Sequence, residues 1–268
     1  MKRIVMTMLL AASIAGCDQL ISKGPELQEN TEEYFKAHGI VSGQVNELRI
    51  GGTLFRFPAG VGLNPYTGQE AIRTRDGSPM TLSQKECLEQ GKCERVASPI
   101  VKGQADKVSL YLLDDGKGYL PTEHPRGPFY KGATGLFVEI VIGNGYRENV
   151  ADWRTSTAMK SAVLSQDNST NIGLKKYVFD NGKNNSDKSL FYVAENLRTP
   201  KGGSLVINCK SKYEANNGFV AEPAACSAIY QTPQGFSVAY VFSGEMQLPR
   251  WHEVHLAVTS FVDSVIVK

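Results

Sequence analysis

Five cysteines are the residues of this 268-residue chain whose chemistry depends most on their spacing. Four of them form two close pairs, Cys87 with Cys93 and Cys209 with Cys226. A cysteine can form a disulfide, bind zinc or act as a nucleophile. Because the count is odd, Cys17 is left without a pairing partner and needs a role of its own.

The sequence before Cys17 has the organisation of an export signal. Lys2 and Arg3 precede an apolar run that begins at Ile4, and small residues then lead to Ile14-Ala15-Gly16-Cys17. These last four residues resemble the lipobox of bacterial lipoprotein signal peptides. The resemblance implies that residues 1–16 are removed and that Cys17 is acylated. The alternatives are an ordinary secretory signal or a short membrane helix, but the run is shorter than the roughly 20 residues that a spanning helix needs.

The lipobox resemblance also implies a membrane anchor and a location. Three acyl chains exceed the two signals that stable anchoring requires, so residues 17–34 are expected to be a lipidated N-terminus and tether to a periplasm-facing domain. Asp18 resembles the inner-membrane retention signal of enteric bacteria; where that rule does not apply, the outer membrane is expected. Within this segment and just after it, Leu27, Tyr34 and Phe35 could form one side of a short docking helix.

The other four cysteines are predicted to form two disulfides. Disulfides persist in the oxidising compartment that export implies. Four cysteines allow three pairings, and closeness in sequence favours Cys87–Cys93 and Cys209–Cys226. A zinc site is the alternative, but the separations of these cysteines fit zinc-ligand spacing poorly. No metal and no cofactor is therefore predicted.

The charge of the chain is close to balanced. Lys and Arg number 29 and Asp and Glu 27, which gives a formal net charge of +2. Lys2 and Arg3 account for this excess, so removal of residues 1–16 leaves a balanced body. Nucleic acid is not expected as a partner, because phosphate binding depends on an excess of basic residues.

The predicted fold class is α+β, with two pseudo-repeated units that each consist of an antiparallel β-sheet plus a helix. Each unit would have the order β-β-β-α and the two could enclose a cleft; we assign residues 35–165 to the first and 166–268 to the second. Trp153 and Trp251 lie in corresponding helix-like segments. The segments that correspond in order are 51–57 with 202–208, 107–113 with 226–230, and 138–145 with 238–244. Chance similarity between unrelated segments is the alternative.

Two further elements are predicted in the second unit. Residues 172–179 and 188–195 flank Asp180-Asn-Gly, a typical hairpin turn sequence. After Pro249, apolar residues recur at spacings of three and four, which predicts a helix with one buried stripe. The residues of this stripe are Trp251, Val254, Val258, Phe261 and Val265.

Catalytic motifs are weak in this sequence. Gly143-Asn-Gly145 lies between a predicted strand and helix, but Glu148 occupies the third glycine position of a dinucleotide fingerprint, where a carboxylate would repel pyrophosphate. His252 and His255 are three residues apart rather than the four of a metalloprotease helix, so one of them is expected beside the buried stripe instead.

A Ser-His-Asp site is also without support. The sequence contains no Gly-x-Ser-x-Gly motif, and His38 and His124 lie in segments without a matching partner. With the cysteines oxidised or acylated, none is a free nucleophile. We therefore predict a protein that is not an enzyme; a hydrolase is the less favoured alternative.

Three segments are predicted to decorate the scaffold as loops. Within residues 58–106, Ser83 and Glu86 have capping-box spacing, which predicts a short helix clamped by Cys87–Cys93. Segments 114–134 and 210–225 carry aromatic and arginine side chains of the kind found in binding hot spots. The candidate partner-binding residues are Tyr119, Arg126, Phe129, Tyr130, Tyr213 and Phe219. The alternative is that these loops fold back on their own domain.

The whole layout resembles the periplasmic immunity lipoproteins that accompany type VI secretion effectors, especially lipases. The only diagnostic motif that carries this resemblance is Ile14 to Cys17. It implies that the protein binds a cognate toxin, a lipid-hydrolysing effector, and occludes its active site. The alternative is an envelope lipoprotein that binds a small apolar ligand or assists envelope assembly.

Overall fold

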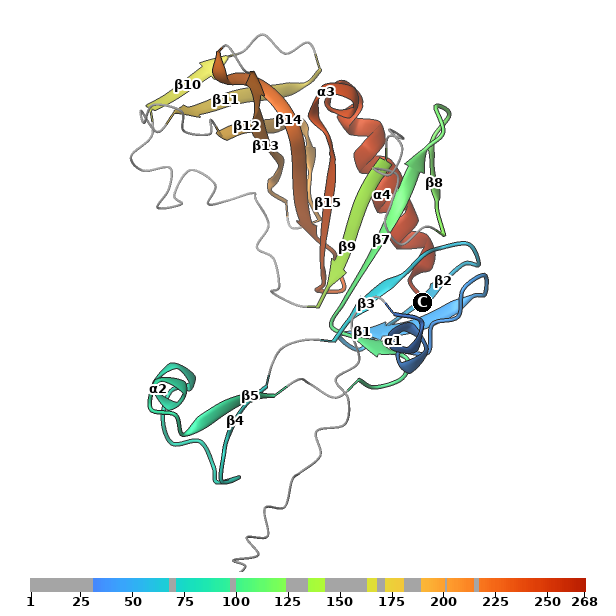
Figure 1. The fold of residues 1–268 in the computed structure, drawn as a ribbon. Coiled ribbons are helices and arrows are strands. Elements are labelled where there is room, and N and C mark those ends of the chain that lie inside the picture. Colours follow the sequence, from blue (N-terminus) through green and yellow to red (C-terminus); the bar gives the residue numbers. More distant parts are fainter. Residues whose placement is uncertain are drawn as a thin grey trace, which may run out of the picture.

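A computed structural model gives the fold of the chain (Figure 1). The residues that it describes are 31–67, 71–96, 100–123, 135–142, 163–167, 172–180, 189–200, 202–214 and 217–268. The lipobox, most of the tether and the predicted helix around Trp153 lie outside these residues.

A ten-stranded antiparallel sheet carries most of the structure (Figure 1). Its strands are β3 (Asn64–Tyr66), β7 (Lys107–Asp114), β8 (Tyr119–Pro121), β9 (Gly135–Val141), β10 (Val163–Asp167), β11 (Leu174–Asp180), β12 (Ser189–Arg198), β13 (Ser204–Glu214), β14 (Gly218–Gln231) and β15 (Ser237–Ser243). They lie in the order β10-β11-β12-β13-β14-β15-β9-β7-β3, with β8 paired to β7. The α+β class is confirmed, with strands far outnumbering helices in the described part of the chain.

The ten-stranded sheet runs through both predicted units. β15 pairs with β9, where Tyr240 lies opposite Val138 and Val238 lies opposite Ile140. The predicted counterparts 138–145 and 238–244 therefore contain adjacent central strands of one sheet, which accounts for their similar patterns. The predicted division between residues 165 and 166 falls inside β10.

The predicted correspondence between the two units is not reproduced by the strands. Segment 51–57 contains β2 (Thr53–Phe57), which belongs to a separate three-stranded sheet, whereas its counterpart 202–208 begins β13 of the large sheet. The expectation of a separate sheet for each unit is wrong, because pairing β9 with β15 satisfies two strand edges that separate sheets would leave open.

The predicted hairpin in the second unit is confirmed. β11 and β12 are antiparallel neighbours, with Leu174 opposite Ala194 and Phe179 opposite Ser189. The residues of the turn after Asp180 lie outside the described part. β10 extends this meander on one side and β13 on the other.

A three-stranded sheet packs beside the large one. It consists of β1 (Asn46–Ile50), its antiparallel partner β2, and β6 (Gln104–Ala105), which runs parallel to β1. Gly51 and Gly52 connect β1 to β2 with φ angles of 55° and 89°. Two consecutive left-handed residues match a type I′ turn, so glycine at both positions suits a tight hairpin.

The C-terminal helix packs its predicted stripe on the large sheet. Two short helices, α3 (Gly244–Gln247) and a 3-10 turn (Leu248–Arg250), lead from β15 into α4 (Trp251–Val265). Val254, Val258 and Val262 are completely buried, so the predicted stripe is confirmed and also includes Val262. Figure 1 shows α4 lying along the strands β15, β9 and β7.

The C-terminus then ties the helix to the three-stranded sheet. The Val267 amide donates to the Leu54 carbonyl at 2.9 Å, and Ile266 forms a bridge with Phe55. The Phe55 ring meets the ring of Phe236 edge to face, with centroids 5.1 Å apart. One hydrophobic core therefore joins the three-stranded sheet, the large sheet and α4.

His255 is the polar member of the buried face of α4. As predicted, one histidine of the pair lies beside the stripe: His255 is 6% exposed, and His252 is exposed to solvent. The Tyr240 hydroxyl and Nδ1 of His255 form a hydrogen bond of 2.8 Å. Burial, with a smaller contribution from the nearby His252, lowers the pKa of His255 from 6.5 to about 4.

This buried histidine makes stability depend on pH. Because the folded-state pKa lies below the unfolded-state value, the unfolded chain binds the proton more strongly. The free energy of unfolding should be fully retained above pH 6.5 and fall by on the order of 3 kcal/mol between pH 6.5 and pH 4. Urea unfolding across this range should show a flatter profile for His255→Gln than for the unsubstituted protein. His252→Gln is the control and should keep the slope; parallel profiles for all three proteins would contradict the prediction.

Candidate partner-binding site

Only Tyr119 among the predicted partner-binding residues of segment 114–134 lies in the described part of the chain. It belongs to β8, its hydroxyl accepts a hydrogen bond from Nε2 of Gln247 at 3.2 Å, and its ring packs against the main core. Burial raises its pKa. These contacts favour the alternative in which this part of the segment folds back on its own domain. Arg126, Phe129 and Tyr130 lie outside the described residues.

An ion pair fixes the same region to α4. Nη2 of Arg250 lies 2.5 Å from Oδ2 of Asp114, whose side chain is only 4% exposed. The hydrogen bond with Asp114 raises the pKa of Arg250. A buried carboxylate requires such a partner, so Asp114 and Arg250 hold β7 against the beginning of α4 rather than presenting charge to a partner.

The predicted loop 210–225 is a hairpin extension of the sheet. β13 and β14 continue through it, and Tyr213 lies opposite Phe219 in their register. Cys209 and Cys226 are themselves register partners and are bonded, with Cα atoms 4.0 Å apart. The expectation of a loop was wrong because the strands run beyond the disulfide. The structure describes the backbone of Tyr213 and Phe219 but not the surroundings of their side chains.

The second disulfide closes a small module that projects from the main body (Figure 1). We call residues 71–96 the disulfide module. It contains the antiparallel strands β4 (Ala71–Thr74) and β5 (Cys93–Val96) and the helix α2 (Gln84–Glu89). The Cys87–Cys93 bond joins α2 to β5, and the predicted clamped helix is confirmed.

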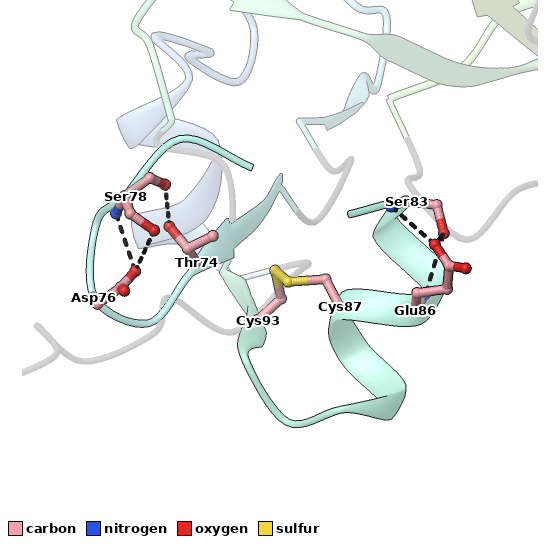
Figure 2. The surroundings of a disulfide bond; sticks show 7 residues. All are labelled: Thr74, Asp76, Ser78, Ser83, Glu86, Cys87 and Cys93. Carbon is pink, nitrogen blue, oxygen red and sulfur yellow. Dashed lines mark hydrogen bonds between the residues drawn. A yellow bond between two sulfur atoms is a disulfide. The ribbon is translucent and has the colours of Figure 1, made fainter. Parts of the chain in front are cut away.

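Short-range hydrogen bonds fix the two turns of this module, as Figure 2 shows. Ser83 and Glu86 form the predicted capping box at the start of α2. In the loop after β4, Oδ1 of Asp76 accepts from both the amide and the hydroxyl of Ser78. These hydrogen bonds lower the pKa values of Asp76 and Glu86. Both carboxylates are therefore charged at neutral pH.

A hollow with both polar and apolar lining lies between the loop and the helix of the disulfide module. Its volume is about 390 Å³, and it is lined by Thr74, Arg75, Asp76, Ser78, Pro79, Thr81, Leu82, Cys87, Gly91 and Lys92. Cys87 and Cys93 are both nearly completely buried. Their disulfide is therefore the buried link between α2 and β5.

A second pocket lies on the main body beside the first helix, α1 (Glu32–Ala37). Thr31 caps α1 by accepting from the Tyr34 amide, and Tyr34 is buried as the predicted docking helix requires. Leu27, the third residue of that prediction, lies outside the described part. The pocket has a volume of about 390 Å³ and is lined by Glu32, Phe35, Lys36, Ile40, Val41, Ser42, Gly43, Val61, Gly62, Leu63 and Glu123.

Apart from Glu32, which falls in the predicted tether, the residues that line this pocket all belong to the first predicted unit. The pocket is therefore not the cleft between two halves that the sequence suggested. The sequence does not reveal this pocket, because its apolar residues come from α1 and from the irregular segments 40–43 and 61–63, which have no hydrophobic period. The available signal for the pocket was a glycine between two apolar residues, Val61-Gly62-Leu63. Val61 and Leu63 are buried, and a side chain on Gly62 would collide with the Glu123 carbonyl.

The histidines of the described residues are not arranged for catalysis. Nδ1 of His38 donates to the Gln104 carbonyl at 3.1 Å, and burial lowers the pKa of His38. His255 is bound to Tyr240. In the described part of the chain, no carboxylate is hydrogen-bonded to His38, His252 or His255, as a Ser-His-Asp site would require. His124 lies outside it.

The described ranges contain neither a metal-binding group of side chains nor a membrane-spanning helix. No group of three or more His, Cys, Asp or Glu side chains in them is placed to hold a metal ion. No helix in them combines the length and the apolar character needed to cross a membrane.

Known proteins offer few comparisons with this chain. No protein-family model matches it, and no curated protein sequence matches it. Among solved structures, an immunity protein of the Stenotrophomonas maltophilia type IV secretion system has 13% sequence identity and a TM-score of 0.43; the match covers 85% of this chain and 95% of that one. The iron-regulated outer membrane lipoprotein FrpD of Neisseria meningitidis has 14% identity and a TM-score of 0.41 over 82% of this chain and 93% of its own. Both TM-scores are low, and neither match shows the function of this chain.

The two disulfides should contribute to stability in different places. The Cys209–Cys226 bond lies inside the large sheet, so Cys209→Ala/Cys226→Ala should lower the free energy of global unfolding by about 3 kcal/mol through the entropy of the unfolded chain. Cys87→Ala/Cys93→Ala should leave global unfolding nearly unchanged and increase amide hydrogen exchange within residues 71–96. Denaturant unfolding and exchange mass spectrometry on both double variants measure the two effects. A similar loss of global stability in both would contradict the assignment of a separate module.

Proposed function

We propose that this chain is a lipid-anchored periplasmic protein that binds and inhibits a toxic secreted effector, a phospholipase, by occluding its active site. The observation that carries the binding role is the disulfide module. A projecting segment that is fixed by a disulfide, a capping box and an Asp76–Ser78 turn loses little conformational entropy when a partner covers it. Such a segment contributes little to the main core, so a role in recognition accounts for its construction.

The lipobox resemblance supports the anchoring part of this proposal. An acylated Cys17 would keep the protein on the membrane, and the segment from Asp18 to Thr31 can span at most about 50 Å. Confinement within that distance raises the effective concentration of an inhibitor where a phospholipase must act. The phospholipase as target comes from the resemblance to immunity lipoproteins that Ile14 to Cys17 carries.

The role as a non-enzymatic inhibitor is supported by the contacts of the histidines. His38 and His255 are both buried and bound to groups of their own domain, a backbone carbonyl and a tyrosine hydroxyl. A general base needs a ring nitrogen that can reach substrate. Neither of these two buried histidines provides one, so we assign both to the fold and propose a binding role for the exposed features of the molecule.

A second function, binding of a small apolar ligand in the envelope, is supported by the pocket beside α1. Its volume of about 390 Å³ lies within the range of about 300–1,000 Å³ typical of ligand sites. Organic extraction of the purified native protein, followed by mass spectrometry, distinguishes this function: a stoichiometric apolar compound supports it.

The inhibitor proposal predicts binding to the product of the toxin gene that neighbours the gene of this protein. The purified domain beginning at residue 31 should bind that product with nanomolar affinity, and co-expression should protect cells from it. Cys87→Ala/Cys93→Ala should weaken binding about ten-fold or more, because the opened module must be ordered on binding. Cys209→Ala/Cys226→Ala is the matched control and should bind normally at temperatures where it stays folded. Absence of binding and protection by the unsubstituted protein would refute the proposal.

The anchor is tested separately at the N-terminus. Mass spectrometry of the protein purified from membranes should show a chain that starts at an acylated Cys17. Cys17→Ser should yield a protein without lipid that is lost from the membrane fraction, because the acyl chains that provide stable anchoring are then missing. A chain that retains Met1 would overturn the assignment of location.

A further inference from the structure

The pocket beside α1 has an apolar floor and an acidic rim. Its apolar lining includes Phe35, Ile40, Val61 and Leu63, and the last three are buried in the main core. An occupant would therefore sit on side chains that are already fixed by packing. Such a surface gains affinity chiefly by removing apolar area from water.

The charges at the rim do not cancel. Glu32 and Glu123 line the pocket together with a single cation, Lys36, and all three side chains are exposed. None of them forms an ion pair with another residue in the described ranges. The rim therefore carries one net negative charge, which favours a cationic occupant and disfavours a fatty acid or another anionic lipid.

Hydrogen bonds hold the mouth of the pocket in one shape. The buried Asn46 accepts from the Val41 amide at 2.8 Å through Oδ1 and donates to the Val41 carbonyl at 3.0 Å through Nδ2. On the opposite wall, the Gly62 amide donates to the Thr122 carbonyl at 2.8 Å. Both walls are thus formed before an occupant arrives.

One apolar side chain remains uncovered at this fixed mouth. Val41 lines the pocket and is 45% exposed. Val45 is 57% exposed on the same connection but does not line the pocket. A comparison of Val41 with Val45 therefore distinguishes an effect of the pocket from an effect of any exposed apolar side chain.

We propose that the pocket beside α1 receives an apolar side chain of the effector, presented by a segment that carries Lys or Arg next to it. The inference rests on the proposed function and assigns part of the contact surface. Burial of the apolar side chain provides affinity, while the carboxylates of Glu32 and Glu123 select a basic segment and orient it. A fatty acid or another anionic lipid could contact the same apolar lining, but the carboxylates of the rim would repel its charge.

Paired substitutions test the contact with the effector. Val41→Asp places a charge in the mouth and should weaken binding about ten-fold or more, whereas Val45→Asp should change it less than about two-fold. Glu32→Lys should slow association more than Glu33→Lys, a charge reversal at an exposed neighbour on α1 that does not line the pocket. Surface plasmon resonance measures all four variants, and unchanged unfolding midpoints confirm that each is folded.

The outcomes separate this inference from the proposed function. If the unsubstituted protein does not bind the effector, the proposed function and the inference both fail. If it binds and Val41→Asp binds equally well, the inference alone fails.

A matched pair of small probes tests the pocket's chemistry without the effector. Phenylbutylamine and phenylbutyrate share one apolar arm and carry opposite charges. In NMR titrations, the amine should shift the amide signals of residues 40–43 and 61–63 at millimolar concentration, and the carboxylate should do so at least about five-fold more weakly. The double variant Glu32→Gln/Glu123→Gln should remove this preference. Equal or tighter binding of the carboxylate, or no shift at these residues with either probe, would overturn the inference.

Discussion

The pairing of β9 with β15 is the constraint on which the rest of the structure depends. It joins strands that are far apart in sequence and places them at the centre of one sheet. α4 follows β15 after two short helical turns and covers this central region with Val254, Val258 and Val262. The end of the chain then reaches the three-stranded sheet through Val267. Loss of this one pairing would divide the large sheet into the strands β10–β15 and the strands β9, β7, β8 and β3.

The candidate binding features are attached to this scaffold in two different ways. The pocket beside α1 uses side chains of the main core as its floor, so its shape is as stable as the fold itself. The disulfide module is linked to the scaffold through β4 and β5 and has its own internal bonds. The first kind of site requires the whole domain to fold, and the second requires oxidation. A protein that acts outside the cytoplasm satisfies both conditions.

Sequence reasoning was successful where the signal was local. The capping box at Ser83 and Glu86, both cysteine pairs, the hairpin of β11 and β12 and the stripe of α4 all depend on residues within a short distance along the chain. It failed on long-range pairing, because strands with the same alternation are equally suited to two separate sheets or to one. The pocket beside α1 was missed for a related reason: Phe35, Val61 and Glu123 meet only once the sheets are assembled.

The position of the Cys209–Cys226 bond has a consequence for how the sheet reaches its correct alignment. Up to this bond, β13 and β14 pair regularly, with Ile207 opposite Ala228, whereas beyond it the register shifts at Ser211 and again at Lys212. A slip of one residue would turn the side chains of a strand to the opposite face. Because Cys209 and Cys226 are register partners, their bond fits the correct alignment of the regular part and not a slip by one residue. The bond therefore fixes this alignment at the point where the irregular pairing of the hairpin end begins.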